Sequence, residues 1–539
     1  MKLPKELKIF ILLVFVSNVV FATDYFVNTV EGNDKNDGKS EANAWKSLKK
    51  VSKKNFQSGD RILLATGQEF FGSIVLESES GKKSKPIEIS SYVYNNATEK
   101  PIINAKGFLN GIKLTNCSHI KISNLSIKAN GGKRPKKGMR CGVFYTTTKS
   151  GKYQNITIEN VSVSDVYFED QGFARGAKEV KTANGTQSYG WGIRFIVPNK
   201  SGATMKDVTI RDCDVRNVAH TGIKLNGVIV NLKIHDNTIY KVGGPGMQFS
   251  FIENGHIKGN IVNNSGANDD SRKWGRGSGM WTWGCDTMLI EHNEFRNANG
   301  PADSAGCHID FNCKNIVVQY NISENNAGGF CEILGNNWNC AYRYNISIND
   351  GHRVKKKGVA FQEGKIYWLS GFVGKDRERH GPYNSYFYNN TIYVKSDVLA
   401  KMAVAKVAKG ALLANNIFYI EGKSKAVLGD QYQPQEAGEA KIPNVVFKNN
   451  LFLKSENWPN DVLIQDEAPL FGNPEFVNAG GKESKDYMPT NIPLVQNKGI
   501  VIEKIPNDKK GLFVGLKVKK DILGNAIQGK PDMGAIELQ

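Results

Sequence analysis

QYNISEN (Gln319–Asn325) and RYNISIN (Arg343–Asn349) are two copies of one short unit, an asparagine followed by an alternating, β-branched run. The unit recurs along the chain with its asparagine at Asn124, Asn160, Asn237, Asn260, Asn293, Asn321, Asn345, Asn390, Asn416 and Asn450, and with Cys213 at the equivalent place. Successive spacings from Cys213 to Asn345 are 24, 23, 33, 28 and 24 residues. A repeat of this length predicts a solenoid, whose coils each bury an apolar side against the next coil.

A second strand-like unit precedes each asparagine. Examples are GIKL (Gly222–Leu225), GMQF (Gly246–Phe249) and GMWT (Gly279–Thr282), followed by HIDF (His308–Phe311) and FCEI (Phe330–Ile333). Each tetrapeptide alternates, so its second and fourth residues should be buried and its third should point outward. The asparagines of successive coils should then hydrogen-bond to one another as a ladder, as stacked amides do in in-register strands.

These repeats resemble the right-handed parallel β-helix proteins of the pectate-lyase-like superfamily. The resemblance implies an all-β solenoid with capped ends and with loop insertions on one face. It divides the chain into an N-terminal cap with the first coils (23–100), the helix repeats (101–455), and last coils with a C-terminal cap (456–539). Within the N-terminal part, residues 46–52 are expected to form a short helix over the open core, because an uncapped solenoid exposes strand edges.

The start of the chain is typical of a secretory signal peptide, residues 1–22: lysines, then a short apolar run, then small residues. We therefore expect a secreted or periplasmic protein that does not span a membrane. The leader carries three lysines and one glutamate, so the formal net charge of +19 becomes +17 in the mature chain. In an exported protein such a charge favours an acidic polysaccharide over nucleic acid as the partner.

Eight cysteines in 539 residues are too few for a disulfide scaffold. Several occupy apolar positions of the repeats, which predicts packed free thiols. No nucleotide-binding or zinc motif is present in the sequence.

The outward positions form a column with distinctive chemistry. One rung per coil, we expect it to read Arg194, Lys224, Gln248, Trp281, Asp310 and Glu332. A neighbouring outward file should contain His308 and Trp283. Arg194 and Lys224 are expected to bind an anionic group of a substrate, and exposed indoles are expected to stack on sugar rings. Trp274 and Arg276, in the insertion before β-strand residue Met280, should line a wall of the same cleft.

Asp310 and Glu332 are 22 residues apart, one coil, so they are predicted to be direct neighbours about 4.8 Å apart along the backbone. Two such carboxylates cannot both ionise freely, which suits the acid and base of glycoside hydrolysis. His308 is a candidate proton shuttle, and Asp303, on the turn before it, is a third candidate carboxylate. The same pair would also suit a calcium ion, or could be an acidic surface without function.

The sequence therefore favours an exported enzyme that hydrolyses glycosidic bonds of a polysaccharide and acts as a monomer, with no cofactor except the optional calcium. Two alternatives stay open. One is a polysaccharide lyase in which Lys224 removes a proton next to a uronate carboxyl group. The other is a glycan-binding or adhesion solenoid without turnover, since the fold alone does not choose among these functions.

Overall fold

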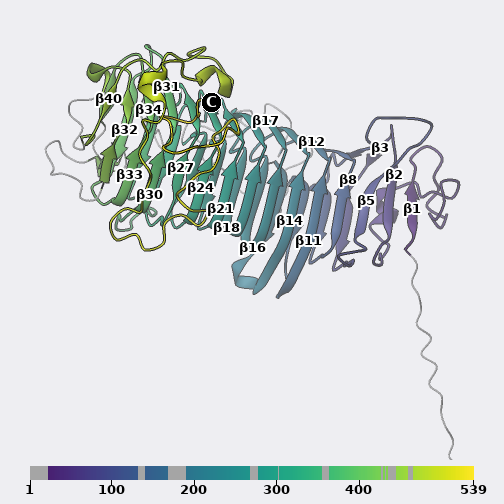
Figure 1. Cartoon of the computed structure of the whole chain (residues 1–539). Helices are drawn as coiled ribbons and strands as arrows, with labels where there is room; N and C mark the ends of the chain where they lie inside the picture. The colour runs from purple at the N-terminus through teal and green to yellow at the C-terminus, as the bar shows by residue number, and fades with distance from the viewer. Residues whose placement is uncertain are drawn as a thin grey trace, which may run out of the picture.

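The computed structural model describes residues 22–130, 140–167, 190–267, 277–300, 303–354, 363–426, 429–430, 433–434, 445–458 and 465–539. Parallel strands stack along one axis, from β1 at one end to β40 at the other (Figure 1). The predicted all-β solenoid is confirmed. The predicted signal peptide, except Ala22, lies outside the described residues.

Each coil contributes strands to three faces, and strands of one face pair in parallel with the next coil. Face 1 consists of β4 (Ile74–Glu77), β7 (Asn110–Thr115), β10 (Cys141–Thr146), β13 (Trp191–Val197), the first part of β16 (Ile223–His235) and of β18 (Met247–Lys258), β20 (Met280–Trp283), β23 (Cys307–Ile309), β26 (Gly329–Ile333), β29 (Lys365–Leu369), β32 (Ala400–Val404) and β35 (Ser424–Ala426).

Face 2 consists of β1 (Asp24–Val27), β2 (Arg61–Ala65), β5 (Ile87–Tyr92), β8 (Ile120–Ser123), β11 (Gly151–Glu159), β14 (Ala203–Arg211), the second part of β16 and of β18, β21 (Asp286–Glu291), β24 (Lys314–Gln319), β27 (Ala341–Arg343), β30 (Tyr383–Tyr388), β33 (Lys409–Ala414) and β38 (Val445–Lys448). In two coils, β16 and β18 run through the corner between faces 1 and 2 as continuous strands.

Face 3 consists of β3 (Glu69–Phe71), β6 (Ile102–Asn104), β9 (Ser126–Ala129), β12 (Ser162–Val166), β15 (Asp214–Val218), β17 (Thr238–Val242), β19 (Ile261–Ser265), β22 (Glu294–Arg296), β25 (Ile322–Glu324), β28 (Ile346–Ile348), β31 (Thr391–Val394), β34 (Ile417–Ile420), β39 (Leu451–Phe452) and β40 (Leu470–Phe471). The remaining elements are the antiparallel pair β36 (Gly429–Asp430) and β37 (Gln433–Pro434), helices α1 (Leu48–Val51) and α2 (Ile492–Val495), and 3-10 turns at Asn199–Ser201, Ser455–Asn457 and Ser484–Tyr487. Among these described helices, none has the length and hydropathy of a membrane span.

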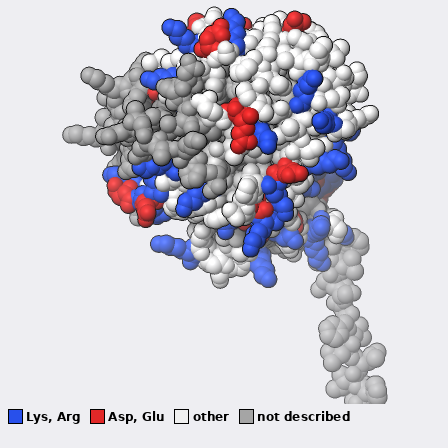
Figure 2. All heavy atoms as spheres, turned by 60° about the vertical axis from the view of Figure 1, so that its left-hand side comes forward, with Lys and Arg blue, Asp and Glu red and all other residues white. Residues whose placement is uncertain are grey.

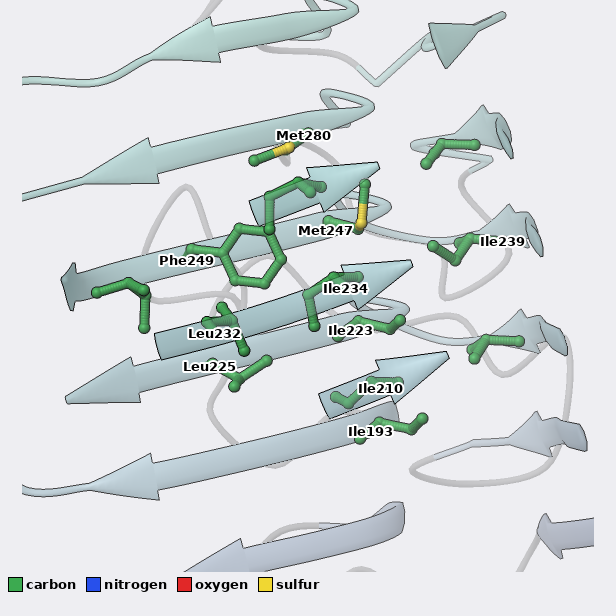
Figure 3. Close-up of a cluster of buried hydrophobic side chains, with 14 of the residues drawn as sticks. Ile193, Ile210, Ile223, Leu225, Leu232, Ile234, Ile239, Met247, Phe249 and Met280 are labelled. Atoms are coloured by element: carbon green, nitrogen blue, oxygen red, sulfur yellow. The ribbon is translucent and has the colours of Figure 1, made fainter. Parts of the chain in front are cut away.

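The inward side chains of the three faces form one continuous core along the solenoid. Ile193, Leu225 and Phe249 come from successive coils of face 1 and point toward Ile210 and Ile234 of face 2 (Figure 3). Each of these side chains is fully buried. Because β-branched and aromatic side chains stack on like side chains of the next coil, every coil is stabilised by its two neighbours.

All eight cysteines are free thiols and all are buried, as predicted. Seven of them, Cys141 excepted, belong to the continuous core. Burial raises the pKa of the Cys213 thiol to about 12, so it stays protonated and unreactive at neutral pH.

The predicted asparagine ladder exists from Asn237 onward. At every step the side-chain Nδ2 and the backbone N of one asparagine both donate to Oδ1 of the next, for example from Asn293 to Asn321 at 2.9 Å each. The ladder runs through Asn237, Asn260, Asn293, Asn321, Asn345, Asn390, Asn416 and Asn450, all buried. Asp466 accepts the last donation, from Asn450.

Asn124 and Asn160 do not belong to this ladder, which corrects the prediction. They have positive φ angles of 56° and 51° and lie on the outside, where Asn160 donates to Asn124 at 2.8 Å. The ladder position in these coils is one residue later, at Leu125 and Val161, which are fully buried. Asparagine tolerates a left-handed backbone, so it is common at the outer corner position as well as at the ladder position next to it. The sequence alone did not distinguish these two adjacent positions.

The two ends of the solenoid differ. At the N-terminal end, α1 places Leu48 and Val51 in the core, and Ser47 caps it by accepting from the backbone N of Lys50, so the predicted capping helix is confirmed. At the other end, β38–β40 continue the coils. The chain beyond them then returns over the outside of the β24–β34 coils (Figure 1), where Tyr388 donates to the carbonyl of Leu516 at 2.7 Å.

We expect Asn321→Ala to destabilise the fold by about 2–4 kcal/mol, because it leaves two buried donors of Asn293 without their acceptor. Urea unfolding followed by circular dichroism measures the change. Asn43→Ala, on an exposed loop, is the matched control. A loss below about 1 kcal/mol at Asn321 would contradict a structural role for the ladder.

Face 3 carries a buried carboxyl group at Asp350. Its Oδ1 accepts from the backbone N and Nδ2 of Asn326 at 2.8 and 2.9 Å, and its Oδ2 accepts from the Ser347 hydroxyl at 2.7 Å. Burial raises its pKa from 3.8 to about 7. The folded state therefore holds a proton that the unfolded state has lost between pH about 4 and about 7, so stability falls as pH rises through this window.

Asp350→Asn should remove this pH dependence, because the amide keeps the oxygen acceptor and can donate to Ser347 without ionising. Above pH about 7 we expect the free energy of unfolding of the variant to exceed that of the wild type by a few kcal/mol, because a change of one in pKa corresponds to about 1.4 kcal/mol. Denaturant midpoints measured across the pH range check this. Parallel stability curves for the two proteins would refute a raised pKa at Asp350.

Candidate active site

The outward column of face 1 differs from the predicted column at one rung. Strand pairing aligns Trp281 with His308, and Ile309 with Ile333, so the rung between Trp281 and Glu332 is His308 and not Asp310. The prediction aligned His308 with Gly279, the first residue of the tetrapeptide in the preceding coil. In the structure the residue aligned with Gly279 is Gly306. A side chain at Gly306 would lie 2.3 Å from the Ser323 hydroxyl, so only glycine fits at this position. The position of this glycine therefore fixes the register of the strand.

Asp310 is therefore a diagonal neighbour of Glu332 and not a direct one. It lies two residues beyond His308 on the same outward side, and strand spacing places its Cα about 8 Å from that of Glu332. Both carboxyl groups are buried, with 5% of each residue exposed. The predicted separation of 4.8 Å is wrong, but both carboxylates lie on one face of adjacent strands.

His308 connects the carboxylate to the rest of the column. Its Nδ1 lies 3.7 Å from Oε2 of Glu332 and 3.3 Å from the Ser278 hydroxyl. Its ring is 5.7 Å from the Trp281 ring. An imidazole between a hydroxyl and a carboxylate can hold or pass a proton. His308 can therefore exchange a proton with the carboxyl group of Glu332.

Trp283 lies in the next outward file, close to Asp310. Its ring packs 4.7 Å from Phe251 and 5.8 Å from Phe311, and Phe311 in turn contacts Phe372. Phe311, expected in the core, is instead part of this partly exposed aromatic file. Trp281, expected to be exposed, is buried, with 4% exposed. Of the two indoles, Trp283 is thus the more accessible.

Asp303 lies on the turn that leads into β23, with a φ angle of 46°. Arg353 fixes this turn by donating from Nη1 to the carbonyl of Gly300 at 2.8 Å and from Nη2 to the carbonyl of Asp303. Lys401 in turn donates to the carbonyl of Arg353 at 3.2 Å. These contacts hold the backbone of the third candidate carboxylate in the coil that carries His308 and Asp310.

Arg194, Lys224 and Gln248 occupy the column as predicted and are buried. The Arg194 guanidinium lies 3.7 Å from the centre of the Trp191 ring, the Lys224 ammonium lies 5.1 Å from it, and His220 stacks against Trp191. Burial lowers the pKa of Arg194 to about 10. Burial, together with the charge of Arg194, holds the pKa of Lys224 well below its ordinary value.

One rung of the column, Trp368, was not predicted from the sequence. Trp368 pairs with Glu332 on the following coil, and the ammonium of Lys365 lies 4.0 Å from its ring centre. An insertion separates Glu332 from Trp368 by 36 residues, which hid the repeat. The alternation in KIYWL (Lys365–Leu369) was the available signal.

Trp274 and Arg276 lie outside the described residues, so their predicted place in a cleft wall stays a prediction. In the described part of the chain, no group of three or more His, Cys, Asp or Glu side chains is arranged to hold a metal ion.

The stacked three-faced coils and the register of the column define a right-handed parallel β-helix protein. A model of the family "Right handed beta helix region" matches residues 191–392, which are the coils that carry the column.

Two relatives extend this comparison. The chain is 24% identical to the lacto-N-biosidase of Bifidobacterium longum subsp. longum, over 96% of this chain but 36% of that protein, so it spans about a third of the relative's length. The crystal structure of a GH136 lacto-N-biosidase from Eubacterium ramulus superposes with a TM-score of 0.53 and 19% identity, covering 76% of this chain and 67% of that one. This structural likeness supports the fold.

We expect Lys224→Met to stabilise the protein at neutral pH by about 1–3 kcal/mol, because it removes a buried amine that stands beside Arg194. Unfolded lysine binds its proton more tightly than folded Lys224, so wild-type stability falls as pH drops below about 10. The variant should lack this slope in denaturant titrations at several pH values. Lys113→Met, in the same column but half-exposed, is the control, and an equal slope in the Lys224 variant would contradict the lowered pKa.

Proposed function

We propose that this protein is a glycoside hydrolase whose catalytic groups lie on face 1, with Asp310 and Glu332 as the principal carboxylates. The observation that carries the proposal is the gathering of Asp310, Glu332 and His308 on adjacent strands of a chain that is similar over 96% of its length to a lacto-N-biosidase. Hydrolysis of a glycosidic bond needs an acid and a base or nucleophile, and carboxyl groups supply both in most such enzymes. Asp303 is the third carboxylate of the proposal.

The structure supports particular roles for the neighbouring groups. His308 lies between Ser278 and Glu332, so it can set the protonation of that carboxyl group. Trp283 offers an aromatic surface against Phe311, the residue that follows Asp310, and aromatic faces pack against sugar rings. Arg194, Lys224 and Gln248 continue the column away from the carboxylates and would contact more distant sugars of the substrate.

The proposal includes three further points. The substrate is an acidic glycan, the protein is exported from the cell, and it acts as a monomer. The net charge of +19 supports an acidic substrate, and basic side chains are spread over the visible surface and not gathered in one patch (Figure 2). The apolar run and small residues at the start of the chain support export. The relative's name adds lacto-N-biose glycosides to the substrates worth testing.

A lyase is the second candidate, because Lys224 is buried with its pKa well below the ordinary value. A neutral amine of this kind can accept the proton that β-elimination removes next to a uronate carboxyl group. The two reactions leave different products: hydrolysis gives only new reducing ends, whereas elimination also gives an unsaturated sugar that absorbs in the ultraviolet.

The test is a panel of neutral, uronic and sulfated polysaccharides and lacto-N-biose glycosides, with reducing ends and ultraviolet absorbance recorded with and without chelator. We expect reducing ends without the absorbance. Asp310→Asn and Glu332→Gln should each lower kcat by about 10²–10⁴-fold without changing the melting temperature. Glu253→Gln, an exposed carboxylate on face 2, is the control and should keep full activity.

Other outcomes would overturn the proposal. Unsaturated products would identify a lyase and direct mutagenesis to Lys224. Activity retained by both carboxylate variants would remove face 1 as the active site. Binding to a glycan without any turnover would favour the adhesion alternative.

A further inference from the structure

A cavity lies on the coils that carry the candidate active site, but at another corner. It has a volume of about 460 Å³ and lies between the start of face 2 and the returning C-terminal segment. The residues that line it are Lys314, Asn315, Trp338, Asn339, Asn384, Asn507, Asp508, Lys509 and Lys510. We call it the Trp338 cavity. An indole, several amides and three lysines make its lining polar with one flat aromatic wall.

Trp338 exposes a large aromatic side chain, with 38% of the residue accessible. Tyr383 of the next coil stacks on one side of its ring, with centroids 4.0 Å apart and planes at 12°. The indole nitrogen donates to Oδ1 of Asn336 at 3.2 Å. The ring is therefore held in one orientation, which lowers the entropy lost when a ligand packs against it.

The opposite wall is fixed by Asp508. Its carboxylate accepts from Nδ2 of Asn339 at 2.9 Å, from the Tyr386 hydroxyl at 2.5 Å, and from the backbone N of Lys510 and of Gly511 at 3.0 Å each. These bonds attach the C-terminal segment to face 2 at this point. The cavity is thus formed before any ligand arrives, as binding sites usually are.

The charge of the rim is positive. Lys314, Lys509 and Lys510 are exposed, and in the described part of the chain none of the three forms an ion pair. Asp508 is the one carboxylate of the lining, so three lysines and one carboxylate leave the lining with a formal charge of +2. An anionic substituent would find a net positive charge next to amides that can bind hydroxyls.

The cavity is also close to the candidate active site along the chain. Trp338 is the sixth residue after Glu332, a span of at most about 22 Å in extended backbone. Likewise, Lys314 follows Asp310 by four residues. The same two coils therefore present carboxylates on face 1 and, at the next corner, Trp338 and Lys314.

We propose that the Trp338 cavity is a second glycan-binding site, which takes an oligosaccharide segment carrying a carboxylate or sulfate group. The choice of a glycan rests on the proposed function. One sugar ring packs on Trp338, the asparagine amides bind its hydroxyls, and the lysines bind its anionic group. Two sites on adjacent faces of one rigid solenoid raise the effective concentration of a long glycan at the catalytic carboxylates.

Binding is tested by affinity electrophoresis of the Glu332→Gln protein through gels containing each polysaccharide of the panel, with and without Trp338→Ala. We expect Trp338→Ala to weaken binding of acidic polysaccharides by about tenfold. Tyr240→Ala removes an equally exposed aromatic residue of face 3 and should leave binding unchanged. The double variant Lys509→Ala/Lys510→Ala should weaken binding of uronic and sulfated chains but not of neutral chains, and high salt should do the same.

The outcomes separate this inference from the proposed function. Binding that depends on Trp338 in a protein without turnover would uphold the second site and overturn the hydrolase. Turnover that depends on Asp310 and Glu332, with Trp338→Ala binding as tightly as its parent, would overturn the second site alone. Failure of the parent protein to bind any glycan of the panel would also overturn it, and melting curves of each variant verify that the fold is intact.

Discussion

The ladder of buried asparagines is the constraint on which the solenoid depends. A coil must turn between faces 2 and 3 inside the core, where backbone donors and acceptors have no water. Each ladder asparagine provides hydrogen-bond partners for both kinds of backbone group. Its amide nitrogen donates to backbone carbonyls, as Asn321 does to Ile290, and its amide oxygen accepts from the backbone N of the asparagine in the coil before it. The same side chain therefore supplies hydrogen bonds to the buried turn and fixes the spacing between one coil and the next. Where Leu125 and Val161 replace asparagine, in the N-terminal coils, the inward side chain of the turn is apolar, and the neighbouring Asn124 and Asn160 hydrogen-bond to each other on the outside.

Because coil height is fixed, side chains from distant parts of the sequence meet in columns on the outside. Trp281, His308, Glu332 and Trp368 span 87 residues of sequence but occupy consecutive strands of face 1. A flexible scaffold could not hold a carboxylate and an imidazole 3.7 Å apart from separate turns of the chain. The rigidity of the ladder is thus what allows chemistry to be distributed over coils, with insertions between coils free to vary.

Much of this organisation could be predicted from the sequence. The repeat revealed the fold, the ladder from Asn237 to Asn450, the capping helix and the burial of the cysteines. The cationic rungs Arg194 and Lys224 and the carboxylate of Glu332 were also placed correctly. The error at Asp310 arose because the repeat was taken as HIDF (His308–Phe311) and not as the glycine-led GCHI (Gly306–Ile309) two residues earlier. Period-two alternation is unchanged by a slip of two residues, so alternation alone makes His308 and Asp310 equivalent. The leading glycine distinguishes the registers, because a side chain at Gly306 would collide with the Ser323 hydroxyl of face 3. Distances between side chains, and the cavity at Trp338 formed with residues 507–510, depend on how the chain returns and have no local signal.

The return of the C-terminal segment has a consequence for how the protein is made. A solenoid can assemble coil by coil as it leaves the ribosome, since each coil contacts mainly its neighbours. Here, however, Asn339, Tyr386 and Tyr388 on central coils obtain hydrogen-bond partners from Asp508 and Leu516. Those partners are synthesised more than a hundred residues after the coils they cover. The middle of the solenoid therefore stays incomplete during synthesis, and only translation of the final segment closes its surface.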